Sequence, residues 1–161
     1  MRPAPFYGWV VVGAAFSVLF MAYGAQFSFG VFFSALLEEF GWSRGALSGA
    51  FALYAFGYSG LAAVSGRLTD RWGPRAVIAT GGVFLGAGWI AMSTTSAIWH
   101  PYVFYGVVAA VGMSTANVPC TATVARWFAR RRGLATGLTS AGGSFGAFCL
   151  PPIAQLLVSG V

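Results

Sequence analysis

Side chains that commonly carry chemistry are few in this sequence, and they lie far apart along the chain. Besides nine arginines, the candidates are three acids, one histidine and two cysteines: Glu38, Glu39, Asp70, His100, Cys120 and Cys149. A metal centre needs several such ligands at one place, and acid–base or nucleophilic catalysis needs a positioned pair or triad. The isolated cysteines lie in apolar surroundings, where a thiol is usually a small buried side chain. We therefore expect no catalytic residues, no metal site and no cofactor.

The composition of the 161-residue chain is typical of a membrane protein. Apolar residues make up 58% of it, aromatic residues 17% and charged residues only 7%, whereas a soluble domain is roughly 25% charged. So few polar groups cannot cover the surface of a soluble fold of this size. The net charge of +6 comes from arginines in short clusters between apolar runs, which indicates membrane topology and not nucleic-acid binding. Soluble enzymes, disordered tails and nucleic-acid partners are excluded.

Charged residues divide the chain into the uncharged runs 3–37, 45–66, 76–125 and 133–161. A spanning helix needs about 20 apolar residues, so only the run 76–125 can hold two. That run is interrupted at 96–101 (SAIWHP), where Pro101 suits a helix start and His100 falls in a loop. The pattern predicts an all-α polytopic membrane protein with five helices, over 8–36, 45–67, 76–95, 101–124 and 133–158.

The arginines predict how these helices are oriented. If the N-terminus is cytoplasmic, Arg44 alone lies outside, and eight arginines lie inside: Arg2, Arg67, Arg71, Arg75, Arg126, Arg130, Arg131 and Arg132. Such an excess in short cytoplasmic loops is the usual arrangement. We expect an integral protein of the cell (inner) membrane. Five spans would leave Val161 outside, so residues 1–161 are expected to be one N-terminal transmembrane segment that stops before a sixth helix.

The segment 66–75 (GRLTDRWGPR), between the second and third predicted helices, is the most specific motif. It resembles the loop signature of the major facilitator superfamily at five positions: Gly66, Asp70, Arg71, Gly73 and Arg75. In that superfamily the loop acts as a conformational latch between two halves of a twelve-helix transporter. The residues alone also fit a tight cytoplasmic hairpin with ordinary positive charges. Gly66 would let a neighbouring helix approach, and Gly73 with Pro74 would turn the chain into a new helix.

Two further segments resemble signatures of the monocarboxylate transporter family and its microbial relatives, including oxalate:formate exchangers. The first is 7–11 (YGWVV), and the second runs over 126–138 (RWFARRRGLATGL) and continues into 140–142 (SAG). The second segment also fits a cytoplasmic anchor that binds anionic lipid. Arg44 and Arg132 are each the first residue of a similar six-residue stretch, 44–49 and 132–137, which is expected of inverted three-helix repeats in the superfamily fold.

Few polar side chains lie within the predicted helices, and the resemblance implies that some of them line a central path. On the fourth helix, Gly106, Ala110, Met113, Asn117 and Thr121 recur at helical spacing. The carboxamide of Asn117 could serve an anion or tie two helices together, and the residues leave both open. The tentative substrate-binding residues are Asn117, Gln26, Phe27, Thr121, Ser144 and Phe145, with Tyr54 and Tyr58 as weaker candidates.

The resemblance implies secondary active transport of a small carboxylate, such as lactate, pyruvate or oxalate, by alternating access. Proton symport and anion exchange both remain open, so protons are a possible partner beside the carboxylate, membrane lipid and the missing C-terminal half. One alternative is a non-transporting membrane scaffold or partner subunit, which helices rich in small residues could also form. Another is a major facilitator exporter of a different small solute.

Overall fold

The computed structural model describes residues 5–128 and 131–159 and is helical throughout. Its elements are α1 (Pro5–Phe40), α2 (Arg44–Trp72), α3 (Pro74–Met92), α4 (Trp99–Val103), the π-helix η1 (Phe104–Ala109), α5 (Ala110–Trp127) and α6 (Arg132–Ser159). The chain divides into two compact units. The first unit comprises residues 1–31 and 120–161, and the second unit comprises residues 32–119.

Five helical stretches among the described residues are long and apolar enough to cross a membrane. They are Tyr7–Phe40, Arg44–Trp72, Pro74–Met92, Trp99–Trp127 and Arg132–Val158. The prediction of a helical membrane protein with five spans is therefore confirmed. Cys120 is buried in α5 and Cys149 is half-buried in α6, and both are free thiols. Arg44 and Arg132, the first residues of the two similar stretches, each begin a helix.

Several helices run past the charged residues that marked their predicted ends. The first reaches Phe40 and not residue 36, and α2 continues through Arg67, Asp70 and Arg71 to Trp72. Residues 68–72 were therefore wrongly assigned to a loop. A charged residue limits the part of a helix that can lie in the hydrocarbon core, but it does not prevent the backbone from continuing as a helix. The α2 helix ends at Gly73, whose φ of 83° is favourable for glycine, and Pro74 follows as the first residue of α3.

The third and fourth spans also differ from their predicted bounds. Helix α3 ends at Met92 and not at 95, and α4 begins at Trp99, so His100 lies in a helix and not in the loop. The His100 imidazole binds the segment that connects α3 to α4, because its Nδ1 accepts hydrogen bonds from the backbone N–H groups of Ser96 (3.0 Å) and Ala97 (3.2 Å). The fourth span then passes without interruption through η1 into α5.

In the second unit, small residues let α2 and α3 pack closely on the fourth span. A Cβ atom added to Gly112 of α5 would lie 2.7 Å from the carbonyl oxygen of Gly81 on α3. One added to Gly106 of η1 would lie 3.0 Å from Leu53 Cδ2 of α2. Two long-range hydrogen bonds join α2 to the fourth span: Tyr102 Oη donates to the Ala46 carbonyl (2.6 Å), and Ser65 Oγ donates to the Ser114 carbonyl (2.7 Å).

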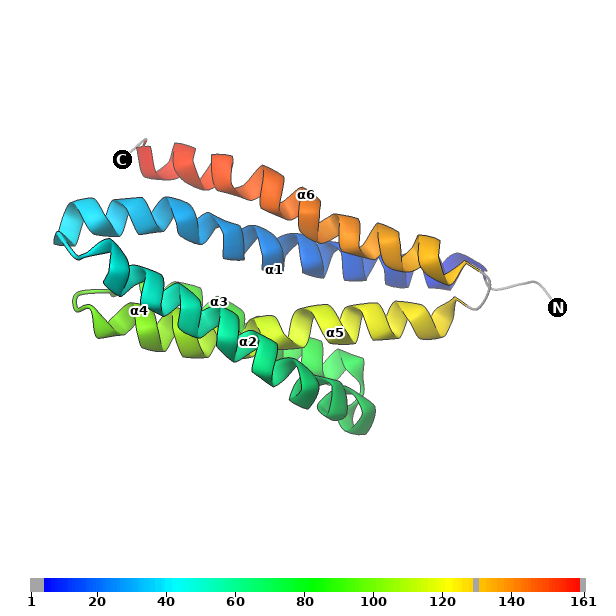
Figure 1. Cartoon of the computed structure of the whole chain (residues 1–161). Coiled ribbons are helices and arrows are strands. Elements are labelled where there is room, and N and C mark those ends of the chain that lie inside the picture. The colour runs from blue at the N-terminus through cyan, green and yellow to red at the C-terminus, as the bar shows by residue number, and fades with distance from the viewer. Residues whose placement is uncertain (1–4, 129–130, 160–161) are drawn as a thin grey trace. The chain divides into compact units, whose positions relative to one another are not determined.

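In the first unit, α1 and α6 run side by side (Figure 1). Three glycines of α6 contact aromatic residues of α1, at the pairs Gly142–Phe16, Gly146–Phe20 and Gly143–Tyr23. Any side chain at Gly142 or Gly146 would overlap the α1 backbone. Phe16 pairs with Gly142 and Phe20 with Gly146, so residue numbers rise together along the seam. The two helices are therefore parallel, and their contact depends on glycine.

Substitution of Gly112 by alanine tests the close packing of the second unit. Gly112→Ala should lower the free energy of unfolding by about 1–3 kcal/mol, because backbone atoms of α3 must move to admit the methyl group. The matched control is Gly86→Ala on α3, where an added Cβ would meet no atom within 4 Å. Thermal unfolding in mild detergent measures both. Equal melting temperatures for the two variants would contradict this packing.

Candidate substrate-binding and latch residues

On α1, the two candidate residues Gln26 and Phe27 have opposite environments. Gln26 is only 8% exposed, and its Oε1 accepts no hydrogen bond from the residues that the structure describes. Phe27 is 54% exposed. A buried carbonyl oxygen without a donor is unfavourable by about 1–3 kcal/mol. Gln26 is therefore a position at which a donor from outside the described chain would be stabilising.

On α6, Ser144 and Phe145 are both exposed, and the Phe145 ring lies 6.0 Å from that of Phe20 between ring centres. The α1–α6 register places Ser144 and Phe145 near residues 18 and 19 of α1. Gln26 lies about eight residues further along, which is roughly 12 Å at 1.5 Å per residue. The structure thus does not bring the α1 and α6 candidates together within the first unit.

Asn117 and Thr121 are half-buried on α5, one turn apart. Between them lies Pro119, a fully buried proline inside the helix. Proline removes a backbone N–H and its ring displaces the carbonyl four residues earlier, so it commonly bends a helix. Pro119 was not among the predicted site residues, although a proline within an apolar run is visible in the sequence. It places both candidates beside an irregularity of the fourth span.

The rest of the predicted fourth-helix stripe does not line an open path. Gly106 lies against Leu53, and a Cβ at Gly57 would lie 3.3 Å from the Ala110 Cβ, so both positions pack against α2. Met113 is 1% exposed. Helical spacing placed these residues on one face, but it did not show that α2 covers Gly106 and Ala110.

The five latch residues lie on two helices and the single residue between them. Gly66, Asp70 and Arg71 belong to the last two turns of α2, Gly73 links the helices, and Arg75 is in the first turn of α3. A Cβ at Gly66 would meet Val118 Cγ1 at 3.6 Å, an ordinary van der Waals contact. The expected close helix approach at Gly66 is therefore absent. Asp70, Arg71 and Arg75 are exposed.

The two signature segments that resemble monocarboxylate transporters meet in the first unit. The Tyr7 ring lies 5.4 Å from the Trp127 ring, and the Trp9 ring lies 5.4 Å from that of Phe128. A Cβ at Gly8 would lie 3.0 Å from Phe128 Cζ, so glycine at position 8 gives the Phe128 ring its room. Sequence spacing alone did not show this contact, because the segments are more than a hundred residues apart.

A buried aromatic cluster in the second unit involves residues that sequence reasoning missed or assigned otherwise. Tyr54 of α2 stacks on Tyr105 of η1 at 4.3 Å, and the Trp89 ring of α3 packs edge-on against Tyr105 at 5.7 Å. Tyr54 is fully buried and Tyr58 lies beside it at 5.5 Å. The cluster thus joins α2, α3 and η1. In the described parts of the chain, no three His, Cys, Asp or Glu residues form a group that could hold a metal ion.

Comparison with known proteins decides the family. Residues 15–161 match the profile of the Major Facilitator Superfamily. The chain belongs to this superfamily. The match covers the last four spans and most of the first, and it includes the 66–75 segment whose resemblance was noted from the sequence.

The chain is also similar to several animal proteins named as monocarboxylate transporters. It is 34% identical to human monocarboxylate transporter 11 over 152 residues, which cover 94% of this chain and 32% of that protein. It is 31% identical to bovine monocarboxylate transporter 13, in an alignment that covers 95% of this chain and 36% of that protein. It is 33% identical to rat monocarboxylate transporter 3, in an alignment that covers 94% of this chain and 31% of that protein. The chain spans about a third of the length of these relatives.

Proposed function

We propose that this chain is the N-terminal part of a secondary transporter that carries a small carboxylate across the cell membrane by alternating access. The observation that carries the proposal is its similarity, over nearly the whole chain, to proteins named as monocarboxylate transporters. Lactate, pyruvate and oxalate are the substrates we consider, moved with a proton or in exchange for another anion. The proposed orientation has a cytoplasmic N-terminus, which places the 66–75 segment on the cytoplasmic side.

Carboxamides are the side chains in the spans best suited to bind such a substrate. Each amide offers two N–H donors to a carboxylate and one carbonyl acceptor. Gln26 supports this role because its buried Oε1 lacks a donor within the described chain. This oxygen would accept from the hydroxyl of lactate, while the amide N–H groups would donate to the carboxylate. Asn117 supports it because it is half-buried beside the irregularity at Pro119. Phe27 and Phe145 would contribute apolar surface, and Thr121 and Ser144 further hydroxyl groups.

Substrate binding to the full-length protein, expressed from its complete reading frame, tests the proposed carboxamides. Asn117→Ala and Gln26→Leu should each weaken lactate binding by about fivefold or more, since each removes a hydrogen bond to a charged ligand. The melting temperature should change less. Isothermal titration and thermal unfolding, both in detergent, measure the two effects.

The matched control is Ser28→Ala, because among the described residues the Ser28 hydroxyl bonds only to the Gly24 carbonyl of its own helix (2.8 Å). It should bind lactate like the wild type. Lactamide, a neutral analogue of lactate, should bind weakly to every form. Unchanged lactate affinity with a clearly lowered melting temperature would mean that Asn117 and Gln26 only hold helices together.

The latch residues are proposed to bias the conformational cycle and not to touch substrate. Asp70 provides the sharpest test, because a carboxylate near a helix C-terminus opposes the helix dipole. If Asp70 were an ordinary helical residue, Asp70→Asn would keep the transport rate and leave stability equal or higher. We instead expect several-fold slower lactate exchange at normal affinity and expression. The control is Glu38→Gln, near the end of α1, which should exchange lactate at the wild-type rate.

A further inference from the structure

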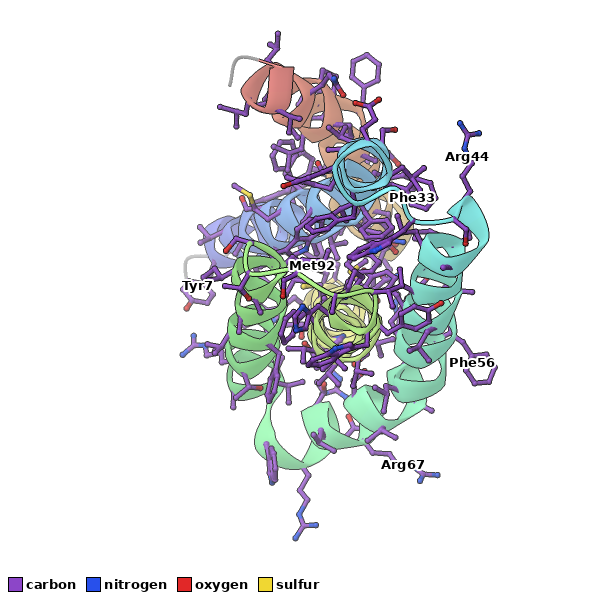
Figure 2. All side chains as sticks on the ribbon, turned by 90° about the vertical axis from the view of Figure 1, so that its left-hand side faces the viewer. Tyr7, Phe33, Arg44, Phe56, Arg67 and Met92 are labelled. Atoms are coloured by element: carbon purple, nitrogen blue, oxygen red, sulfur yellow. The ribbon has the colours of Figure 1, made fainter. Side chains whose placement is uncertain are left out.

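One face of α2 is exposed along most of its length and changes from apolar to cationic near the C-terminal end of the helix. Leu53, Phe56, Gly60, Val64, Arg67 and Arg71 are all exposed and follow one another at spacings of three or four residues, so they share one face. Phe56, 83% exposed, and Arg67 project outward from the helix (Figure 2). The first four are apolar and the last two are cationic.

The dimensions of α2 place the arginines of this face at the membrane surface. Arg44, at the first turn of α2, and Arg67 are 23 residues apart (67 − 44), or roughly 35 Å along the axis. A hydrocarbon core is about 30 Å thick. The apolar part of the face therefore fits against acyl chains, and Arg67 and Arg71 lie at the level of the headgroups. Trp72, 64% exposed, follows directly, as is common at this level.

The two arginines carry more positive charge than the single acid near them, Asp70, can balance. Neither guanidinium group takes part in a hydrogen bond or an ion pair among the described residues. They are four residues apart, where like charges on a helix repel each other. Asp70 lies about 60° around the helix from Arg67, away from the direction of Arg71. A guanidinium group pairs well with phosphate, to which it can donate two parallel hydrogen bonds.

We infer that Arg67 and Arg71 form a binding site for the headgroup phosphate of an anionic phospholipid. The acyl chains of that lipid lie along the face Leu53–Val64. The lipid neutralises the arginine pair and anchors the C-terminal end of α2, next to the connection to α3 at Gly73. The site is separate from the proposed substrate-binding residues, but it shares Arg71 with the latch residues.

Native mass spectrometry of the full-length protein in detergent tests this site. The probes are dioleoyl phosphatidylglycerol and dioleoyl phosphatidylcholine, which share acyl chains and differ in net charge. The wild type should retain phosphatidylglycerol preferentially. Arg67→Gln with Arg71→Gln should weaken that retention about 30-fold, or about fivefold for each arginine. Soluble glycerol 3-phosphate should not displace the lipid, because it lacks the acyl chains.

The matched control is Arg44→Gln, which removes an exposed arginine at the other end of the same helix. It should retain phosphatidylglycerol as the wild type does, and Arg67→Lys with Arg71→Lys should keep most of the binding. Equal retention of the two lipids by the wild type would overturn the inference. So would an equal loss in Arg44→Gln, or displacement of the lipid by glycerol 3-phosphate. Unchanged helix content by circular dichroism excludes misfolding as the cause.

Discussion

The structure depends on the requirement that backbone polar groups inside a bilayer be satisfied within the protein. Each helix satisfies its own backbone N–H and C=O groups by hydrogen bonds within the helix. Lipid, however, provides no hydrophobic force that drives one helix against another. Association must then come from close van der Waals contact, which needs small residues. Gly142 and Gly146 provide it between α1 and α6, and Gly81 and Gly112 provide it between α3 and α5.

Departures from regular helix occur near the residues to which we assign function. The fourth span contains a π-helical turn at Phe104–Ala109 and a proline at 119, two residues after Asn117. Gly73, with its positive φ, separates the latch residues of α2 from Arg75 of α3. π-turns and prolines inside helices often mark functional positions, since they free backbone groups and let a helix bend. Of the proposed residues, Asn117, Thr121 and the latch residues thus lie beside irregular parts of α5 and of the α2–α3 connection.

The number of spans was predictable because the apolar runs are long and charged residues are few. Helix ends were less predictable: α2 continues through Arg67 and Arg71, since charge limits the membrane core and not the helix. Candidate residues could be placed on helices, but their neighbours could not. Gly106 and Ala110 pack on α2, the register of α1 with α6 separates Gln26 from Ser144, and Tyr7 meets Trp127. Each of these depends on packing between distant segments, which periodicity within one helix does not encode.

The central claim is that this chain belongs to a working carboxylate transporter, and uptake into vesicles tests it most directly. Proteoliposomes with the full-length protein would be given labelled lactate, pyruvate or oxalate, with labelled lactamide as the neutral control. The account predicts saturable uptake of at least one carboxylate, accelerated by an inward proton gradient or by a second carboxylate inside, and none of lactamide. Uptake of all three carboxylates at the rate of protein-free vesicles, in both conditions, would contradict it.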